Sequence, residues 1–402
     1  MPVHALLLPA LLLALVSCGS PEGGQESAAS TPPASAPTAA AGPPAQTTFR
    51  LNWETSEPVL VGTEVKQRPV RRSQELPLPS AQPDAAFWEQ AEQWFSELER
   101  RQPQDVRWTR QGEVWTAQAQ HGWQVDREAS RASIERALAS GRREASPTVL
   151  RVAPERTVAW AAQQRLGHLY TGETAFTGSP EFRVHNIRVG ADKVSGKWLE
   201  PGETFDFNAR VGQISAANGF QPGYVITGNT LSMEDGGGLC QVSTTVFRAA
   251  FGAGLPITER HAHSYQVAYY GEPGLDAAVY APSKNLRWIN DTGAPLLLQA
   301  EWNLDTEQLF IHLFGRDDGR EVRISEPQIR GAALPPDPTY VADKALSGDD
   351  IKRLDMPAPG GLVTVNREVI VGGKKRQMEM VSRYRPWGGV FAVPPGDLRL
   401  AD

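Results

Sequence analysis

The sequence predicts an α+β protein with several domains, and three observations support this. At 402 residues the chain is long enough for two or three domains. Its 32 prolines and 37 glycines indicate linkers and loop-rich β domains rather than a helical bundle. Stretches with strand alternation and stretches with helical spacing of apolar residues follow one another along the chain. The net charge of −6 is mild and gives no electrostatic reason to expect nucleic acid as a partner.

The first 48 residues predict export of the chain and a flexible tether. An apolar run over residues 5–16 is too short for a transmembrane helix but suits the core of a signal peptide. It leads into a Leu-Val-Ser-Cys motif ending at Cys18, which resembles the lipobox of bacterial lipoproteins. We therefore expect residues 1–17 to be a lipoprotein signal peptide and Cys18 to carry the lipid that anchors the exported chain to a membrane of the cell envelope. Residues 18–48, mostly Ser, Ala, Pro, Gly and Thr, are expected to be a disordered tether. A plain secretory signal is the alternative, and it also predicts export.

Residues 49–160 predict a small α+β domain. One helix is expected from Asp84, as N-cap, to about Arg101, and another from about Arg127 to Ser140. The expected strands cover residues 59–62, 106–109, 114–117, 122–126 and 148–152. This order resembles the small α+β domain that precedes catalytic domains in peptidoglycan-modifying proteins, so the domain is a candidate for peptidoglycan binding. Its tryptophans are either core residues, the commoner role, or a sugar-binding face.

The stretch from Gly236 to Cys240 carries the strongest chemical signal. Three glycines precede an apolar pattern that predicts a helix closed by Gly252 or Gly254. Cys240 would then lie where a glycine loop enters a helix N-terminus, and the positive end of the helix dipole favours a thiolate there. If Cys18 carries lipid, Cys240 is the one thiol left in an exported chain, where an unpaired thiol is exposed to oxidation and is therefore expected to have a use. The alternative is a buried cysteine that packs as a small hydrophobe.

A central α+β domain is expected over residues 173–328, because several motifs occur there in a fixed order. They are Arg183-Val184-His185-Asn186-Ile187, Leu199 to Asn208, Val211-Gly212, Gly219-Phe220, Gly236 to Thr245, Glu259 to Ser264, Gly274 to Tyr280, and Asn285 to Thr292. Together they resemble the VanW family of bacterial envelope proteins, over about a third of the chain. Some proteins with this domain are regarded as L,D-transpeptidases, which cross-link peptidoglycan stem peptides through a cysteine acyl-enzyme. The resemblance implies that Cys240 is the nucleophile, that 3–3 cross-links are formed, and that no cofactor is needed.

The candidate site residues follow from the chemistry of a thiol acyl transfer. One of His261 and His263, which are separated by a single residue, is expected to reach the thiol as the base. We favour His263, because the family resemblance continues directly into the next residue. Asp276 is the candidate for orienting the imidazole or binding the substrate. The alternative is that it is a simple turn aspartate. The loop residues Gly237, Gly238 and Leu239, with the Cys240 amide, are candidates for an oxyanion site. Secondary candidates are His185, Gln241, Ser243, Thr244 and Arg260.

A zinc site is the rival use of these residues. Cys240, His185, His261 and His263 could supply four ligands, but their spacing matches no closed zinc motif and the chain has no Cys-x-x-Cys pair. We therefore predict no metal. The sequence also lacks a phosphate-binding glycine loop and a basic patch for nucleic acid.

The C-terminal part predicts a linker and a β module. Residues 331–358, with several prolines and charges, are the expected linker. Residues 359–402 are expected to form a hairpin-based module, with Val363, Val365 and Val369 on one strand face and a turn at Gly372-Gly373.

Three functions remain open at this point. The first is a lipid-anchored L,D-transpeptidase with peptidoglycan stem peptides as substrate. The second is a cysteine carboxypeptidase that uses the same residues but passes the acyl group to water. The third is a non-catalytic lipoprotein that binds the wall or acts as a scaffold, in which the glycine-rich motif only builds the fold.

Overall fold

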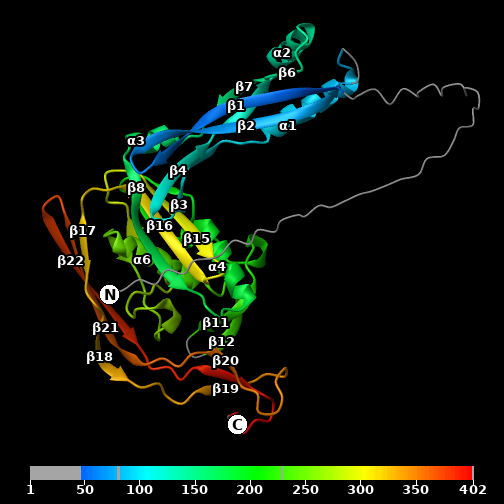
Figure 1. Cartoon of the computed structure of the whole chain (residues 1–402). Coiled ribbons are helices and arrows are strands. Elements are labelled where there is room, and N and C mark those ends of the chain that lie inside the picture. The colour runs from blue at the N-terminus through cyan, green and yellow to red at the C-terminus, as the bar shows by residue number, and fades with distance from the viewer. Residues whose placement is uncertain (1–46, 79–81, 228–229, 401–402) are drawn as a thin grey trace, which may run out of the picture. The chain divides into compact units, whose positions relative to one another are not determined.

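The computed structural model describes residues 47–78, 82–227 and 230–400. The described residues contain both helices and strands, with strands alone after Tyr270, so the predicted α+β class is confirmed (Figure 1). The predicted signal peptide, Cys18 and nearly all of the expected tether lie outside the described residues. Within the described ranges, no helix is long and apolar enough to cross a membrane.

The described chain begins with a long hairpin that sequence analysis recognised only in part. Strands β1 (Thr47–Val61) and β2 (Glu64–Leu78) pair antiparallel over their whole length, around a turn at Gly62 with a φ of +61°. Nearly every residue of β2 is exposed, so the strand shows no apolar alternation that could reveal it. Hydrogen bonds to β1 hold most of its length, and Leu76 and Leu78 at its end are buried in the core.

Both helices predicted in the first domain are confirmed, with their caps. Helix α1 (Ala85–Glu99) begins after Asp84, which accepts a hydrogen bond of 2.9 Å from the Phe87 amide. Helix α2 (Arg127–Ala139) begins after Asp126, which accepts one of 2.9 Å from the Ala129 amide. The other elements of this part are β3 (Gln104–Gln111), β4 (Val114–Gln120), β5 (Gly122–Asp126), β6 (Glu144–Ala145), β7 (Thr148–Val152) and α3 (Val158–Gln163). The sheet order is β2-β1-β4-β3, with β6 beside β1, and β5 pairs with β7.

The tryptophans of this part belong to the core. Trp94, Trp108 and Trp123 are 6%, 4% and 4% exposed, and the half-buried Trp88 and Trp115 pack against the same buried clusters. The interpretation as core residues is therefore confirmed.

The central part is a four-stranded sheet packed against a buried helix. Helix α6 (Leu239–Gly252) lies against β8 (Leu166–Ala175) and β16 (Gln308–Arg316). Gly172 permits this contact, because a Cβ there would lie 2.2 Å from the carbonyl oxygen of Thr245. The sheet order is β8-β16-β15-β9, with β9 at Trp198–Leu199 and β15 at Leu296–Asn303. The remaining elements are α4 (Glu181–Val194), β10 (Thr204–Asp206), α5 (Phe207–Val211), the 3-10 helices η1 (Ala216–Asn218) and η2 (Ala268–Tyr270), β11 (Pro222–Thr227), β12 (Thr230–Asp235), β13 (Ile257–Glu259) and β14 (Arg287–Ile289).

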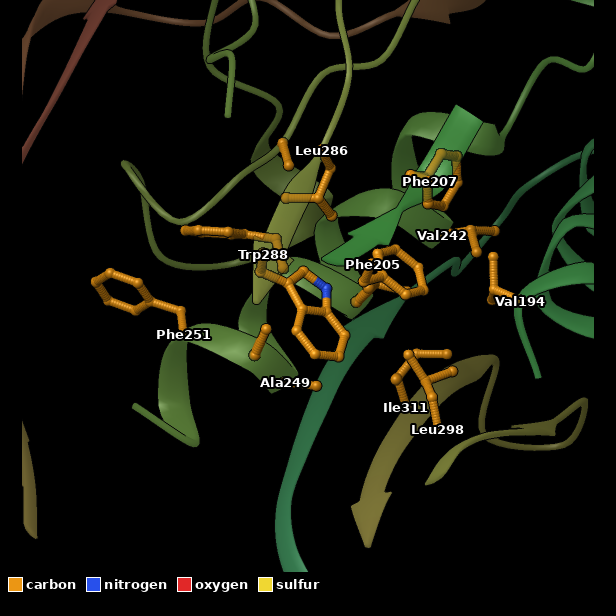
Figure 2. Packing of buried hydrophobic residues seen from close by; sticks show 14 of the residues in the cluster. Val194, Phe205, Phe207, Val242, Ala249, Phe251, Leu286, Trp288, Leu298 and Ile311 are labelled. Carbon is orange, nitrogen blue, oxygen red and sulfur yellow. The ribbon is translucent and has the colours of Figure 1, made fainter. Parts of the chain in front are cut away.

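The helix predicted after the glycine motif is confirmed, and almost every side chain of α6 is buried. Figure 2 shows Val242, Ala249 and Phe251 of this helix among apolar side chains from other elements. Trp288 stacks on Phe205 with ring centroids 4.9 Å apart in the same cluster. Because the helix is fixed on all sides, its N-terminus, which carries Cys240, is fixed as well.

The C-terminal part contains more strands than the predicted hairpin. Strands β21 (Gly360–Val371) and β22 (Lys374–Tyr384) form the expected hairpin around Gly372-Gly373, with Val363, Val365 and Val369 buried. The stretch predicted as a linker holds β19 (Thr339–Ala342) and β20 (Lys352–Asp355), both paired with β23 (Val390–Val393). Strands β17 (Glu321–Ile324) and β18 (Gln328–Ala333) pair with β21. Val365 and Met380 belong to the same buried cluster as α6, so the hairpin packs on the central part.

Candidate active site

The glycine loop before α6 is fixed by backbone conformation and by one asparagine. Gly238, the N-cap, has a φ of +119°, and a Cβ there would lie 3.1 Å from the Arg183 carbonyl oxygen, so only glycine fits without strain. Asn186 on α4 donates from Nδ2 to the carbonyls of Gly237 (3.2 Å) and Gln221 (2.9 Å). Asn186 lies within one of the sequence motifs, but no local pattern there indicates this role. Its side chain anchors the loop that leads to Cys240.

Cys240, His263 and Asp276 form one hydrogen-bonded series. The Cys240 thiol shares a side-chain hydrogen bond with His263 and lies 3.5 Å from the carbonyl oxygen of Val279. Nδ1 of His263 lies 2.5 Å from Oδ2 of Asp276, which also accepts the His263 backbone amide at 2.8 Å. An ionised carboxylate only accepts, so Nδ1 carries a proton and Nε2 is left to face the thiol. The order of groups is that of a nucleophile, a base and a group that orients the base.

The charges in this series favour a thiolate beside an imidazolium. Burial by itself raises the pKa of the Cys240 thiol, but the hydrogen bond and charge of His263 outweigh it and lower that pKa overall. Burial lowers the pKa of His263, yet Asp276 and Cys240 together raise it to about 9. Burial also raises the pKa of Asp276, but His263 and Arg260 bring that pKa well below its ordinary value. The carboxylate therefore stays ionised and supports a charged imidazole.

Asp276 is held on its other oxygen by Arg260 and Tyr384. Nη2 of Arg260 lies 2.8 Å from Oδ1, and its Nε donates to the Asp276 backbone carbonyl at 2.5 Å. The hydroxyl of Tyr384, at the end of β22, also donates to Oδ1. The side chains of Arg260 and Asp276 are only 6% and 8% exposed. This is a buried charge pair whose hydrogen bonds are satisfied, the condition under which such a pair is stable.

The polar residues that follow Cys240 on α6 face the protein interior. Ser243 donates to the Ala277 carbonyl at 2.5 Å, and Thr244 accepts from the Ala277 amide at 3.0 Å. Gln241 donates to the carbonyl of Ala175 at 2.8 Å. Ser243 and Thr244 hold the segment that carries Asp276 against α6, and none of the three is among the described residues that line the pocket.

The other two candidate histidines, His185 and His261, form hydrogen bonds away from Cys240. Nε2 of His261 lies 3.0 Å from Oε1 of Glu259, and Nε2 of His185 lies 2.8 Å from the Gly219 carbonyl. Neither is among the described residues that line the pocket beside Cys240. His185 and His261 therefore have partners apart from Cys240 and His263, and no group of three potential ligands gathers within the described part of the chain.

A pocket of about 660 Å³ opens beside Cys240 and His263. Its wall is rich in tyrosine, and the ring centroids of His263 and Tyr270 are 5.5 Å apart. Arg183 and Asp235 are the charged residues of the lining. The aromatic lining residues are Phe207, Tyr265, Tyr269, Tyr270 and Tyr280. Sequence analysis missed them, although the cluster of tyrosines directly after His263 was a usable signal.

Backbone amides at the N-terminus of α6 are free to donate hydrogen bonds to a ligand. The Leu239 amide donates to the Gly236 carbonyl at 3.1 Å, so it is already used within the loop. The amides of Gly238 and Cys240 have no hydrogen-bond partner among the described residues. Of the four amides considered from the sequence, that of Gly237 also lacks a partner among the described residues, so the amides of Gly237, Gly238 and Cys240 can still donate to a negative oxygen.

Comparison with known proteins places the site within a known domain. Residues 182–314 match the family described as VanW like protein. The chain is 36% identical over 144 residues to the uncharacterized protein YoaR of Bacillus subtilis (strain 168), covering 36% of this chain and 46% of that protein. It is 28% identical over 153 residues to the vancomycin B-type resistance protein VanW of Enterococcus faecalis (strain ATCC 700802 / V583), covering 36% of this chain and 54% of that protein.

The chain thus spans about half the length of the curated relatives it matches. No solved structure gives a significant match. Cys240, His263 and Asp276 all lie inside the matched range, whereas Tyr384 lies beyond it. The resemblance seen in the sequence is therefore confirmed: residues 182–314 of this protein are similar to the VanW family.

Proposed function

We propose that this protein is a cysteine L,D-transpeptidase of the bacterial cell envelope that acts on peptidoglycan stem peptides. The observation that carries the proposal is the hydrogen-bonded series of Cys240, His263 and Asp276 at the wall of an open pocket. The name of one relative associates that protein with vancomycin resistance, which supports an envelope role. An anchor through Cys18 is part of the same proposal.

The first half of the reaction forms a thioester. The Cys240 thiolate attacks the carbonyl carbon of the amide that links a diamino acid to the terminal D-alanine of the donor peptide. The negative oxygen that develops is placed to accept hydrogen bonds from the amides of Gly238 and Cys240. The His263 imidazolium gives its Nε2 proton to the departing nitrogen, so that the C–N bond breaks and D-alanine leaves as an amine.

The second half transfers the acyl group. An amine from a neighbouring stem peptide attacks the thioester carbonyl, and neutral His263 takes up the proton that this nitrogen loses. The C–S bond breaks, the thiolate is restored beside the imidazolium, and a new amide completes a 3–3 cross-link. If water takes the place of the amine, the same steps give a carboxypeptidase.

Cys240→Ala is expected to abolish both the acyl-enzyme and the cross-linked product. The measurement is mass spectrometry of the protein and of the products after incubation with purified tetrapeptide muropeptides. His185→Ala is the matched control, because His185 is on α4 and bonds only the Gly219 carbonyl among the contacts that the structure gives it. Cross-linking by folded Cys240→Ala would disprove the mechanism. Trimmed tripeptides without cross-links would assign the carboxypeptidase reaction, and an unreactive thiol would favour a non-catalytic wall-binding role.

Arg183 in the pocket wall favours a donor peptide that carries a carboxylate. Its Nη1 donates to Ser179 Oγ at 2.6 Å, and its guanidinium lies 4.8 Å from the centroid of the Tyr269 ring. Among the described residues Arg183 forms no ion pair, although Asp235 also lines the pocket. Such a cation in the pocket wall can pair with an acidic group of the substrate, such as the terminal carboxylate of the donor.

Arg183→Met is expected to lower kcat/KM about 10- to 100-fold, mainly through a higher KM, because a hydrogen bond to a charged group is lost. The methionine keeps the apolar stem that lies against Gly238. The measurement compares steady-state kinetics on donors ending in a carboxylate and in a carboxamide. The wild type should prefer the carboxylate and the variant should not, and an unchanged preference would rule out this pairing.

A further inference from the structure

The C-terminal strands contribute a side chain to the site. Tyr384 is 4% exposed, and its hydroxyl donates to Oδ1 of Asp276 while it accepts the Gly274 amide at 2.9 Å. The tyrosine is the last residue of β22, about 70 residues beyond the end of the matched VanW-like range. It therefore belongs to the part that the sequence alone presented as a separate module.

We propose that Tyr384 is a positioning residue for the Cys240–His263–Asp276 series, and that strands β20 to β23 are a structural part of the active site. The effect on acyl transfer rests on the proposed function. The effect on the reactivity of the Cys240 thiol does not, because it concerns only the hydrogen-bonded groups of this chain.

The geometry of Asp276 explains why the tyrosine matters. Oδ2 accepts both hydrogen bonds from His263, while Oδ1 accepts those from Arg260 and Tyr384. A carboxylate held at both oxygens cannot rotate about its Cβ–Cγ bond, so Oδ2 stays aligned with Nδ1 of His263. Burial and the adjacent Asp276 charge raise the pKa of Tyr384, so its hydroxyl keeps the proton that it donates.

The same C-terminal strands hold the segment that carries His263. The Arg385 amide donates to the Ser264 carbonyl at 2.8 Å, and the rings of Tyr265 and Trp387 stack with centroids 5.0 Å apart. Tyr265 also shares a side-chain hydrogen bond with Asp355 of β20. Two segments support the thiol: one carries His263 and the other carries Asp276. Both are thus tied to strands outside the matched domain.

A third contact reaches the arginine that pairs with Asp276. Nη1 of Arg260 donates to Ser382 Oγ at 2.8 Å, and Ser382 is 1% exposed. Ser382 and Tyr384 are two residues apart on β22, so their side chains lie on the same face of the strand. This one face fixes both the carboxylate and its counter-charge.

The test is the pH dependence of iodoacetamide alkylation of Cys240 in the full chain. Tyr384→Phe keeps the buried ring and removes only the hydroxyl. We expect the apparent pKa of the thiol to rise and the rate at pH 7 to fall about three- to tenfold, with the fold intact by circular dichroism. Tyr340→Phe is the matched control, because Tyr340 is on β19 and its ring contacts Phe391 rather than the site.

A pH profile of folded Tyr384→Phe that matches the wild type would overturn the proposal. An equal shift in Tyr340→Phe would also overturn it, since it would reflect general loosening of the C-terminal strands. If Tyr384→Phe fails to fold, Ser382→Ala is measured instead, with a smaller shift in the same direction expected and no shift counting against the proposal. Alkylation needs no peptidoglycan, so these outcomes stand whether or not cross-linking is found.

Discussion

Replacement of His263 by alanine slows alkylation of Cys240 at pH 7 by about 30-fold, because an unassisted thiol with a pKa of about 8.5 is only about 3% ionised there. In the wild type, the hydrogen bond and charge of His263 lower the pKa of the thiol. Since the pKa of His263 is raised to about 9, the imidazolium persists up to that pH. The wild-type rate is therefore expected to change little across neutral pH, whereas the variant's rate rises about tenfold per pH unit towards 8.5.

The same replacement is expected to lower kcat/KM for acyl transfer by roughly 100- to 10,000-fold, the usual contribution of a general acid and base. His261→Ala is the control, because its imidazole pairs with Glu259. It should leave both the alkylation profile and the kinetics close to those of the wild type. A shifted profile in His261→Ala with none in His263→Ala would reverse the assignment, and unchanged profiles in both would remove the Cys–His pair.

The local part of the site could be predicted from the sequence. The glycine run and the apolar spacing after it are signals within one short segment, so α6 and the place of Cys240 at its N-terminus followed directly. His263 and Asp276 lie on segments that connect helices and strands of the same domain. Their residue types and their positions after Cys240 predict them as site residues. Their mutual distance of 2.5 Å is tertiary information that no local pattern contains.

The parts that the sequence did not reveal depend on contacts between distant segments. Strands β19 and β20 fell within a predicted linker because each is four residues long and becomes a strand by pairing with β23. Tyr384 looked like the end of a hairpin, and its role arises only because β22 ends beside Gly274 and Asp276. Likewise, the sequence does not predict which way Gln241 and Ser243 face, since a polar residue beside a nucleophile can face either the pocket or the interior.

Replacement of Asp276 by asparagine is expected to lower acyl transfer by as much as the loss of His263 does. Asparagine has one accepting oxygen, whereas donors meet both oxygens of Asp276: His263 at Oδ2, and Arg260 with Tyr384 at Oδ1. If the NH2 group faces His263, the imidazole loses its orientation and the tautomer that leaves Nε2 free; if it faces Arg260 and Tyr384, the side chain meets two donors and is displaced. We expect a loss of up to about 10,000-fold in kcat/KM, the size seen when the orienting carboxylate of a catalytic triad is made an amide. Asp192→Asn, at an exposed position of α4, should be neutral.

Stability should fall along with activity in Asp276→Asn, because Arg260 is left buried without its counter-charge at a cost of roughly 3–5 kcal/mol. The measurement is urea unfolding followed by circular dichroism, alongside the alkylation profile. Adding Arg260→Met removes the uncompensated charge, so the double variant should regain part of the stability. It should not regain the thiol reactivity, because the orienting carboxylate is still absent. Wild-type alkylation in Asp276→Asn would show that His263 is oriented by its other contacts, and recovery of reactivity in the double variant would show that the carboxylate only balances Arg260.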